Sequence, residues 1–212
     1  MSVTTKFTHK LAGLGLAVML GATGASAETL KYAIGFPPGG AATNGIKEFN
    51  EKLSSEGDVA LKVFELSLLN LKETAPGVRD GLADAGYVIT AYYPAEFSET
   101  NLPVEMSMLS SIGTPTESTG AVMTGVISEY VMLHCPECQA QFKRENQVVL
   151  GAIGTSEYVN LCTTPIRSAT DLKGKKMRSA LAGMGRWAEN FGATKVSLPA
   201  NDIYEAMSQG VV

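Results

Sequence analysis

The sequence predicts an α/β fold, because strand patterns alternate with helical patterns at both ends of the chain. The run TLKYAIGF alternates, turns apolar and stops at PPGG, which predicts a strand closed by a turn. A helical pattern begins at about Ala42 and a second strand, VALKVFEL, follows it, so the chain opens as a β-α-β unit. The segment Thr163–Val212 alternates in the same way.

Apolar spacing places the elements of the opening unit. Ile46, Phe49 and Leu53 recur at helical intervals and are expected to face the core. A short helix is expected after 70–74, followed by a third strand over 88–90. The loop FPPGG follows the carboxyl end of the first strand, which is where open α/β sheets place ligands.

The rest of the chain continues this alternation. A helix is expected over 114–130, with Val122, Val126 and Ile127, or their neighbours, facing inward. The other expected elements are helices over 137–145, 183–191 and 201–209, and strands from Gln147, over YVNLCTTPI, over KKMRSA and over 195–198.

Length and composition favour a folded, exported protein. The 212 residues allow one large or two small domains, and a hydrophobic content of 45% is enough for a core. A net charge of -4 argues against a nucleic-acid partner, since phosphate backbones attract Lys and Arg clusters. Residues 1–27 have the plan of a secretory signal peptide: two lysines, the apolar run LAGLGLAVMLGATG and Ala25-Ser26-Ala27 at the cleavage site. We expect a periplasmic chain that begins at Glu28; the alternative is an uncleaved anchor.

The cysteines allow several uses. In an oxidising compartment, Cys135, Cys138 and Cys162 predict one disulfide and one free thiol, with the pairing open. The motif HCPEC is also similar to the active site of thiol oxidoreductases, although these place it at a helix start after a strand. His134 with the three cysteines could instead hold zinc. We expect a structural disulfide, no metal and no cofactor.

Arg178 is the residue that most clearly points to a ligand. Its planar guanidinium can bind a carboxylate through two parallel hydrogen bonds, which a lysine cannot reproduce. The segment that ends at Arg178, DLKGKKMR, resembles the one that carries the carboxylate-binding arginine in solute-binding proteins of TRAP transporters, the C4-dicarboxylate-binding type. Residues 80–84, DGLAD, and 102–112 also resemble segments of these proteins. The alternative for Arg178 is an ion pair at the surface.

The resemblance implies a two-lobed periplasmic-binding-protein fold, with mixed sheets in each lobe and a ligand cleft between them. The first lobe is expected over 28–150 and the second over 151–212, with a hinge near 150–154 where Gly151 and Gly154 give the backbone freedom. Members of the family continue beyond the point where this sequence stops. The second lobe is therefore expected to be partial and the chain a fragment.

One departure from the family pattern bears on the ligand. Family members often carry a second arginine in a GxR pattern, but here Gly154-Thr155 is followed by Ser156. The ligand is then a monocarboxylate, or Arg186 takes the missing role. Arg186 and Trp187 lie at an expected helix start, where backbone amides favour anions. The alternative places Trp187 in the core and Arg186 in solvent.

Aromatic residues supply candidate walls for the ligand cleft. Phe36, Tyr92 and Tyr93 follow strands of the first lobe, and Tyr158 lies near the expected hinge. Some of these residues are expected to be core. An aromatic-lined pocket with a fixed arginine would suit an aromatic or branched organic acid.

These features predict a binding protein and no enzyme. The expected function is to capture an organic acid between the lobes, close around it, and deliver it to the TRAP permease subunits. The membrane would be contacted only through the permease. Two alternatives remain: the binding protein of an ABC importer, and a periplasmic thiol oxidoreductase that uses Cys135 and Cys138.

Overall fold

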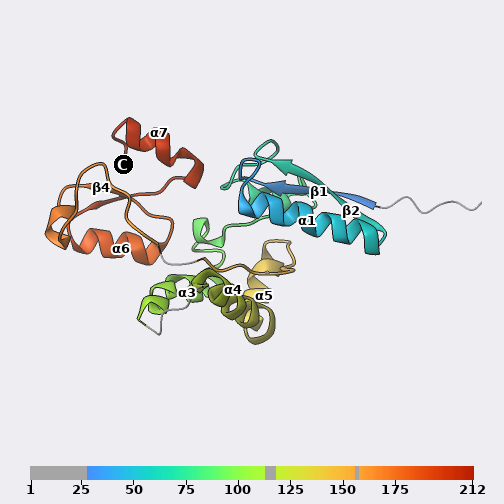
Figure 1. Ribbon diagram of the computed structural model, residues 1–212. Helices are drawn as coiled ribbons and strands as arrows, with labels where there is room; N and C mark the ends of the chain where they lie inside the picture. The colour runs from blue at the N-terminus through green and yellow to red at the C-terminus, as the bar shows by residue number, and fades with distance from the viewer. Residues whose placement is uncertain (1–27, 113–117, 156–157) are drawn as a thin grey trace, which may run out of the picture.

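The computed structural model describes residues 28–112, 118–155 and 158–212. The expected signal peptide lies outside these ranges. Within them, no helix is long and apolar enough to cross a membrane. Two sheets, one of three strands and one of two, lie at opposite sides of the molecule, and a group of helices lies below and between them in Figure 1.

The first sheet is built from the β-α-β unit that the sequence predicts. β1 (Glu28–Ile34), β2 (Val59–Glu65) and β3 (Ala85–Gly86) pair in the order β2-β1-β3, and both pairings are parallel. α1 (Ala41–Glu56) connects β1 to β2, and α2 (Thr74–Arg79) precedes β3. Ala33 and Ile34 are completely buried, so the carboxyl end of β1 anchors the core of this sheet.

α1 packs against β2 through a slightly different face from the one expected. The Asn50 side chain accepts a hydrogen bond from the Leu61 amide (2.6 Å) and donates one to the Leu61 carbonyl (3.0 Å). Ile46 and Leu53 are half-buried, whereas Phe49 is 53% exposed. The expectation for Phe49 is therefore wrong, because the contact line follows the helical steps 46, 50 and 53.

A group of helices lies next to the first sheet (Figure 1). It contains α3 (Ser98–Glu105), α4 (Thr119–Glu129) and α5 (Pro136–Arg144), and a π-helical turn over 130–134 continues α4. Ile127 is buried in a cluster with Val131, Cys135 and Cys138. Val122 and Val126 are about half exposed, at 50% and 52%, so Ile127 alone of the three named residues faces inward.

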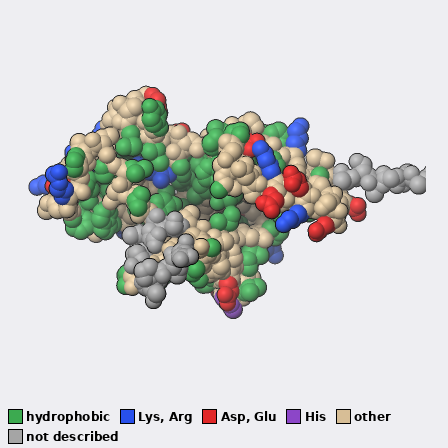
Figure 2. Space-filling view, viewed as in Figure 1, with side chains coloured by type: hydrophobic (Ala, Val, Ile, Leu, Met, Phe, Trp, Pro, Cys, Tyr) green, Lys and Arg blue, Asp and Glu red, His purple; other side chains and the backbone are tan. Residues whose placement is uncertain are grey.

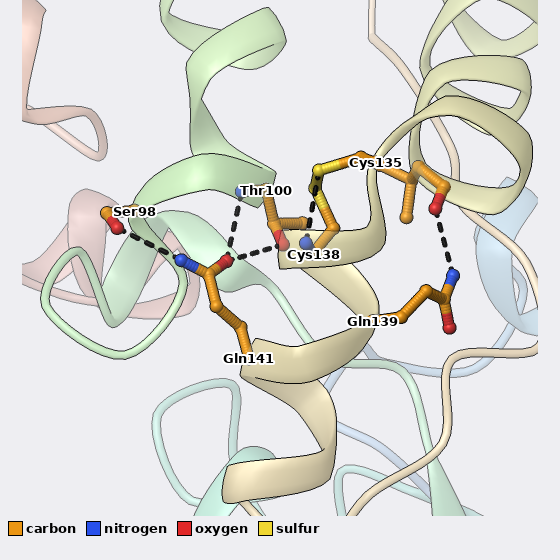
Figure 3. Close-up of a disulfide and its surroundings, with 7 residues drawn as sticks. Ser98, Thr100, Cys135, Cys138, Gln139 and Gln141 are labelled. Carbon is orange, nitrogen blue, oxygen red and sulfur yellow. Dashed lines mark hydrogen bonds between the residues drawn. A yellow bond between two sulfur atoms is a disulfide. The ribbon is translucent and has the colours of Figure 1, made fainter.

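The disulfide joins Cys135 to Cys138 at the start of α5, and Cys162 is free and exposed. One disulfide and one free thiol are the expected count. Figure 3 shows that Gln141, on the same helix, accepts hydrogen bonds from the amide (3.1 Å) and hydroxyl (2.9 Å) of Thr100 and donates to Ser98 Oγ (3.0 Å). These bonds fix α3 against α5.

The second sheet confirms the elements predicted for the last part of the chain. β4 (Lys176–Arg178) and β5 (Thr194–Val196) pair in parallel, and α6 (Ala182–Asn190) connects them. α7 (Ile203–Ser208) follows β5, and a small core forms around Leu172, Ala188 and Ala193. The shorter 3-10 turns of the chain are η1 (Thr90–Tyr92), η2 (Ser107–Ser111), η4 (Ala169–Leu172) and η5 (Ala200–Asp202).

The strand expected over 88–90 lies at Ala85–Gly86 instead, and the strands expected from Gln147 and over 158–166 are wrong. Leu150 is 85% exposed and Leu161 is 79% exposed, and neither segment pairs with a strand in the described part of the chain. A cavity of about 710 Å³ lies between β3 and the extended segment 147–153. Because a strand is held by backbone hydrogen bonds to its neighbour, alternating apolar residues alone do not form a strand here.

All pairings among the described strands are parallel. The antiparallel strands of the expected mixed sheets are therefore not among them.

Charged side chains are interleaved on the face shown in Figure 2. Lys, Arg, Asp and Glu side chains lie together over the part that contains α1, Lys and Arg side chains gather at the opposite end, and hydrophobic and uncharged atoms cover much of the face between them.

Candidate ligand-binding site

Local sequence fixes the segment that leads to Arg178. At η4, Ser168 and Asp171 form a capping box, and Asp171 Oδ2 accepts hydrogen bonds from the amides of Arg167 and Ser168, both at 2.9 Å. These two amide bonds hold the pKa of Asp171 below its ordinary value. The turn before β4 is therefore held rigidly.

β4 then directs Arg178 away from the core of its own unit. Gly174 has a φ of +74°, a conformation that glycine adopts without strain, and it turns the chain into β4. Met177 packs towards the core around Leu172. Successive side chains of a strand point to opposite faces, so Arg178, at the carboxyl end of β4, points to the other side.

Arg178 is half-buried and forms two hydrogen bonds from its guanidinium. Nε donates to the Leu198 carbonyl (3.1 Å) and Nη2 donates to the Tyr92 hydroxyl (2.9 Å). The guanidinium carbon lies 6.0 Å from the centroid of the Tyr92 ring. No ion pair in the described part of the chain involves Arg178. The surface ion pair considered as an alternative is therefore not what holds this side chain.

Tyr92 and Asn201 connect the carboxyl ends of the two sheets. The hydroxyl of Tyr92, at the end of the η1 turn that follows β3, also accepts a hydrogen bond from the Ala200 amide (3.1 Å). Asn201 Nδ2 donates to the carbonyl of Gly35, just after β1 (2.7 Å). Arg178 therefore lies where residues that follow strands of both sheets meet, which is the location that α/β ligand sites favour.

Three aromatic residues gather on the first-sheet side. The rings of Phe36 and Tyr87 pack edge to face, with centroids 5.5 Å apart. Burial, and then the neighbouring phenol of Tyr158, raise the pKa of Tyr87. Phe36 and Tyr158 are thus both neighbours of Tyr87. Sequence reasoning missed Tyr87.

Tyr93 is part of the core rather than a wall. It packs edge to face against the buried Phe97, and its hydroxyl donates to the Lys72 carbonyl (2.5 Å). Burial raises its pKa to about 12.

Lys72 adds a second cation beside Tyr92. Its Nζ lies 5.8 Å from the centroid of the Tyr92 ring, the same ring that Arg178 approaches. Sequence reasoning missed Lys72, because no local motif links it to residues more than a hundred positions away.

The amino terminus of α6 is occupied by a side chain from another part of the fold. Glu105, at the end of α3, accepts hydrogen bonds from the amides of Ala182 (2.8 Å) and Gly183 (2.7 Å). A Cβ on residue 183 would lie 2.2 Å from Glu105 Oε2, so a glycine is needed for this approach. Sequence reasoning had assigned this helix start to a ligand.

The structure does not bring Arg186 or Trp187 into contact with Arg178. Arg186 is exposed, and Trp187 is 43% exposed and packs edge to face on Phe191, with centroids 5.3 Å apart. Their role in ligand binding stays a prediction without a supporting contact.

The disulfide is poorly placed for redox catalysis. Cys135 is 4% exposed and Cys138 is completely buried, so a substrate thiol cannot reach the sulfur atoms without opening the fold. Because both sulfurs are bonded to each other, they are not thiolates available to zinc. No group of three metal-ligating side chains is found among the residues described.

Arg178 does not line either of two open cavities in the described part of the chain. The larger, of about 710 Å³, follows the open edge of β3, and the other, of about 470 Å³, lies along 160–166. Both border segments that have no strand partner among the described residues.

Two α/β units whose strand ends meet around an arginine form a two-lobed α/β protein with a candidate ligand site where the strand ends meet. The chain belongs to the bacterial extracellular solute-binding protein family 7, whose model matches residues 34–212. Members of this family bind solutes and are not enzymes.

Solved structures with this fold come from several bacteria. A marine metagenome TRAP solute-binding protein from an unidentified microbe, specific for aromatic acids and in complex with 3-hydroxybenzoate, has 26% identity and a TM-score of 0.63 over 88% of this chain and 57% of its own. The ectoine-binding protein of Halomonas elongata has 15% identity and a TM-score of 0.71 over 87% and 58%. A Bordetella pertussis solute receptor that binds pyroglutamic acid has 17% identity and a TM-score of 0.63 over 88% and 59%.

These matches cover only part of the relatives. The chain spans a little over half of their length, between 57% and 59% for the three proteins named. The likeness confirms the two-lobed α/β fold.

Proposed function

We propose that the chain captures a small organic acid with Arg178, at the contact between its two sheets, and delivers it to the membrane subunits of a TRAP transporter. The transporter partner is the one that the family implies. The proposal includes export to the periplasm, which the pattern of residues 1–27 supports.

The observation that carries the proposal is a half-buried arginine without an acidic partner among the described residues. Arg178 donates only to a carbonyl and to a hydroxyl, both neutral. A cation removed from water is stabilised when a charged acceptor approaches it. A ligand carboxylate would supply that acceptor with charge-assisted bonds.

Aromatic acids are the class of ligand that the surroundings favour. Phe36, Tyr87 and Tyr158 lie on the first-sheet side, and the backbone next to Phe36 is linked to Asn201. The neighbour at 26% identity is specific for aromatic acids. Aromatic walls bind a flat ring through offset or edge contacts.

Closure would occur about the segment between the two sheets, and we place the lobe boundary near Leu150, with lobes over 28–150 and 151–212. An added Cβ at Gly151 would touch nothing within 4 Å, which suits a hinge. Gly154 is fixed instead: its amide donates to Thr124 Oγ1 (3.1 Å), and a Cβ there would lie 2.5 Å from the Met123 backbone. The backbone freedom proposed for the hinge therefore belongs to Gly151.

Calorimetric titration with benzoate, 3-hydroxybenzoate, mandelate, pyroglutamate and succinate tests the proposal. We expect the chain to bind at least one of these acids. Arg178→Ala should weaken that binding by about 2 kcal/mol or more, roughly a thirtyfold rise in Kd, since a charge-assisted pair is lost.

Arg144→Ala is the matched control, because Arg144 is an exposed arginine at the end of α5. It should bind the acid as the unaltered chain does. Equal affinity of Arg178→Ala and the unaltered chain would remove Arg178 from the site, and binding of none of the acids would contradict the proposed function.

A further inference from the structure

We propose that Lys72 is a second ligand-binding cation, which contacts the ligand carboxylate from the side of the first sheet. This inference rests on the proposed function, and it deepens it by naming a residue that no motif assigns. It also offers a replacement for the arginine that the GxR pattern would have supplied.

The backbone of Lys72 is held in place before any ligand binds. Its amide donates to Asn70 Oδ1 (2.8 Å) and its carbonyl accepts from the Tyr93 hydroxyl (2.5 Å). Leu71 is completely buried, and a Cβ on Gly35 would lie 2.5 Å from the Leu71 amide. The side chain of Lys72 therefore starts from a fixed point next to the carboxyl end of β1.

The ammonium group of Lys72 is directed to the ring that Arg178 also approaches. Nζ lies 5.8 Å from the Tyr92 centroid and the guanidinium carbon of Arg178 lies 6.0 Å from it. An attraction between a cation and an aromatic face acts within about 6 Å and contributes about 0.5–1 kcal/mol at exposed sites. Tyr92 thus holds two positive charges next to the contact between the sheets.

Neither cation has an acidic partner in the part of the chain that the structure describes. The adjacent acid, Glu73, accepts instead from the amide of Asn70 (3.0 Å), and no ion pair joins Lys72 to any described carboxylate. Two like charges beside one ring repel each other, and an anion bound near both relieves that repulsion. An organic acid is such an anion, and both cations would attract it.

Lys72→Gln tests the inference, because glutamine keeps a polar side chain and loses the charge. With the tightest-binding acid of the panel above, we expect about a tenfold rise in Kd, and a weaker dependence of Kd on salt. Lys72→Arg keeps the charge and should bind within about threefold of the unaltered chain. Without ligand, the thermal midpoint of Lys72→Gln should fall by no more than about 4 °C, the effect of losing one exposed cation–π contact, and that of Lys72→Arg should be unchanged, so a structural role of Lys72 is measured apart from ligand binding.

Lys62→Gln is the matched control. Lys62 also lies over an aromatic ring, 5.2 Å from the Phe64 centroid, but on β2. Its replacement should leave Kd unchanged. If Lys72→Gln binds the acid as tightly as Lys62→Gln does while Arg178→Ala loses it, the inference about Lys72 is overturned and the proposed function stands. Binding of no acid by the unaltered chain overturns the proposed function itself.

A measurement on the unaltered chain covers the case in which Lys72→Gln fails to fold. The NMR signal of the Lys72 ε-methylene should shift when the acid is added, and that of Lys62 should not. Absence of a Lys72 shift at saturating acid overturns the inference.

Discussion

Glu105 acts as the cap of α6 although it lies on α3, and removing its carboxylate should destabilise that helix. Glu105→Ala leaves the amides of Ala182 and Gly183 without their acceptor. A lost helix cap costs about 0.5–2 kcal/mol, and a lost charge at the amino terminus costs about 0.3–1 kcal/mol. Since Glu105 is half-buried and both terms overlap, we expect the free energy of unfolding to fall by about 1–2 kcal/mol.

Urea unfolding followed by tryptophan fluorescence measures this loss of unfolding free energy with a probe on α6. Trp187 is the single tryptophan of the chain and lies on α6 itself. Glu51→Ala is the control, since Glu51 is an exposed acid in the interior of α1, away from the helix ends, and forms no ion pair among the described residues. Its effect should stay within about 0.5 kcal/mol.

Gly183→Ala gives the decisive second perturbation. In the unaltered chain, the new methyl group would lie 2.2 Å from Glu105 Oε2 and displace the carboxylate, so the variant should lose stability. In the Glu105→Ala background that clash is absent, and alanine in place of glycine should stabilise the helix by up to about 1 kcal/mol. The reversal of sign is specific to this contact. The same effect of Gly183→Ala in both backgrounds would refute the cap.

Two further predictions concern titration. The pKa of Asp171 is lowered by backbone hydrogen bonds, so its contribution to stability is present above the unfolded pKa of about 4 and is lost as the pH falls through the lower folded pKa. An NMR titration of its carboxyl carbon should have a midpoint below 3.8. A midpoint at or above this value would contradict the capping box. Tyr158→Phe should lower the pKa of Tyr87, because it removes the neighbouring phenol that helps to raise that pKa. NMR of ring-labelled tyrosine measures the pKa of Tyr87. Tyr204→Phe is the control, because it alters a side chain that is 84% exposed and should leave the pKa of Tyr87 unchanged.

Local signals were enough to predict the elements that carry Arg178. The turn DLKG, the capping residues Ser168 and Asp171 and the short strand that follows all act within a few residues. A sequence pattern can specify such contacts because the partners are neighbours in the chain. The same holds for the opening β-α-β unit, whose helix and strands follow their apolar periodicity.

The contacts that assemble the candidate site were beyond the reach of such patterns. Tyr92 and Arg178 are 86 positions apart, and Asn201 and Gly35 are 166 apart. Glu105 and Lys72 carry no motif, so each could be found only once the fold had brought it to its partner. The departure from the GxR pattern was the one sequence signal that bears on a second cation, and it left a monocarboxylate ligand as the alternative.

The strands that were predicted but not found also depend on partners distant in the sequence. The segments from Gln147 and over 158–166 contain alternating apolar residues, but alternation describes only the side chains. A strand also needs a neighbour for its backbone groups, and the described residues provide none at these places. Their apolar side chains remain exposed, as the 80% exposure of Val148 and the 76% exposure of Val159 indicate.

Tyr92 can remain bound to Arg178 when a ligand arrives, because a guanidinium has more donors than the fold uses. Of its five N–H groups, one on Nε and one on Nη2 are engaged by Leu198 and Tyr92. The three that remain, on Nη1 and Nη2, are enough for a carboxylate to bind through both of its oxygens. In the proposed site the Tyr92 hydroxyl would therefore keep joining Arg178 to Ala200 while the acid binds. Ligand binding and the contact between the two sheets would then reinforce each other, since both hold the same guanidinium in one orientation.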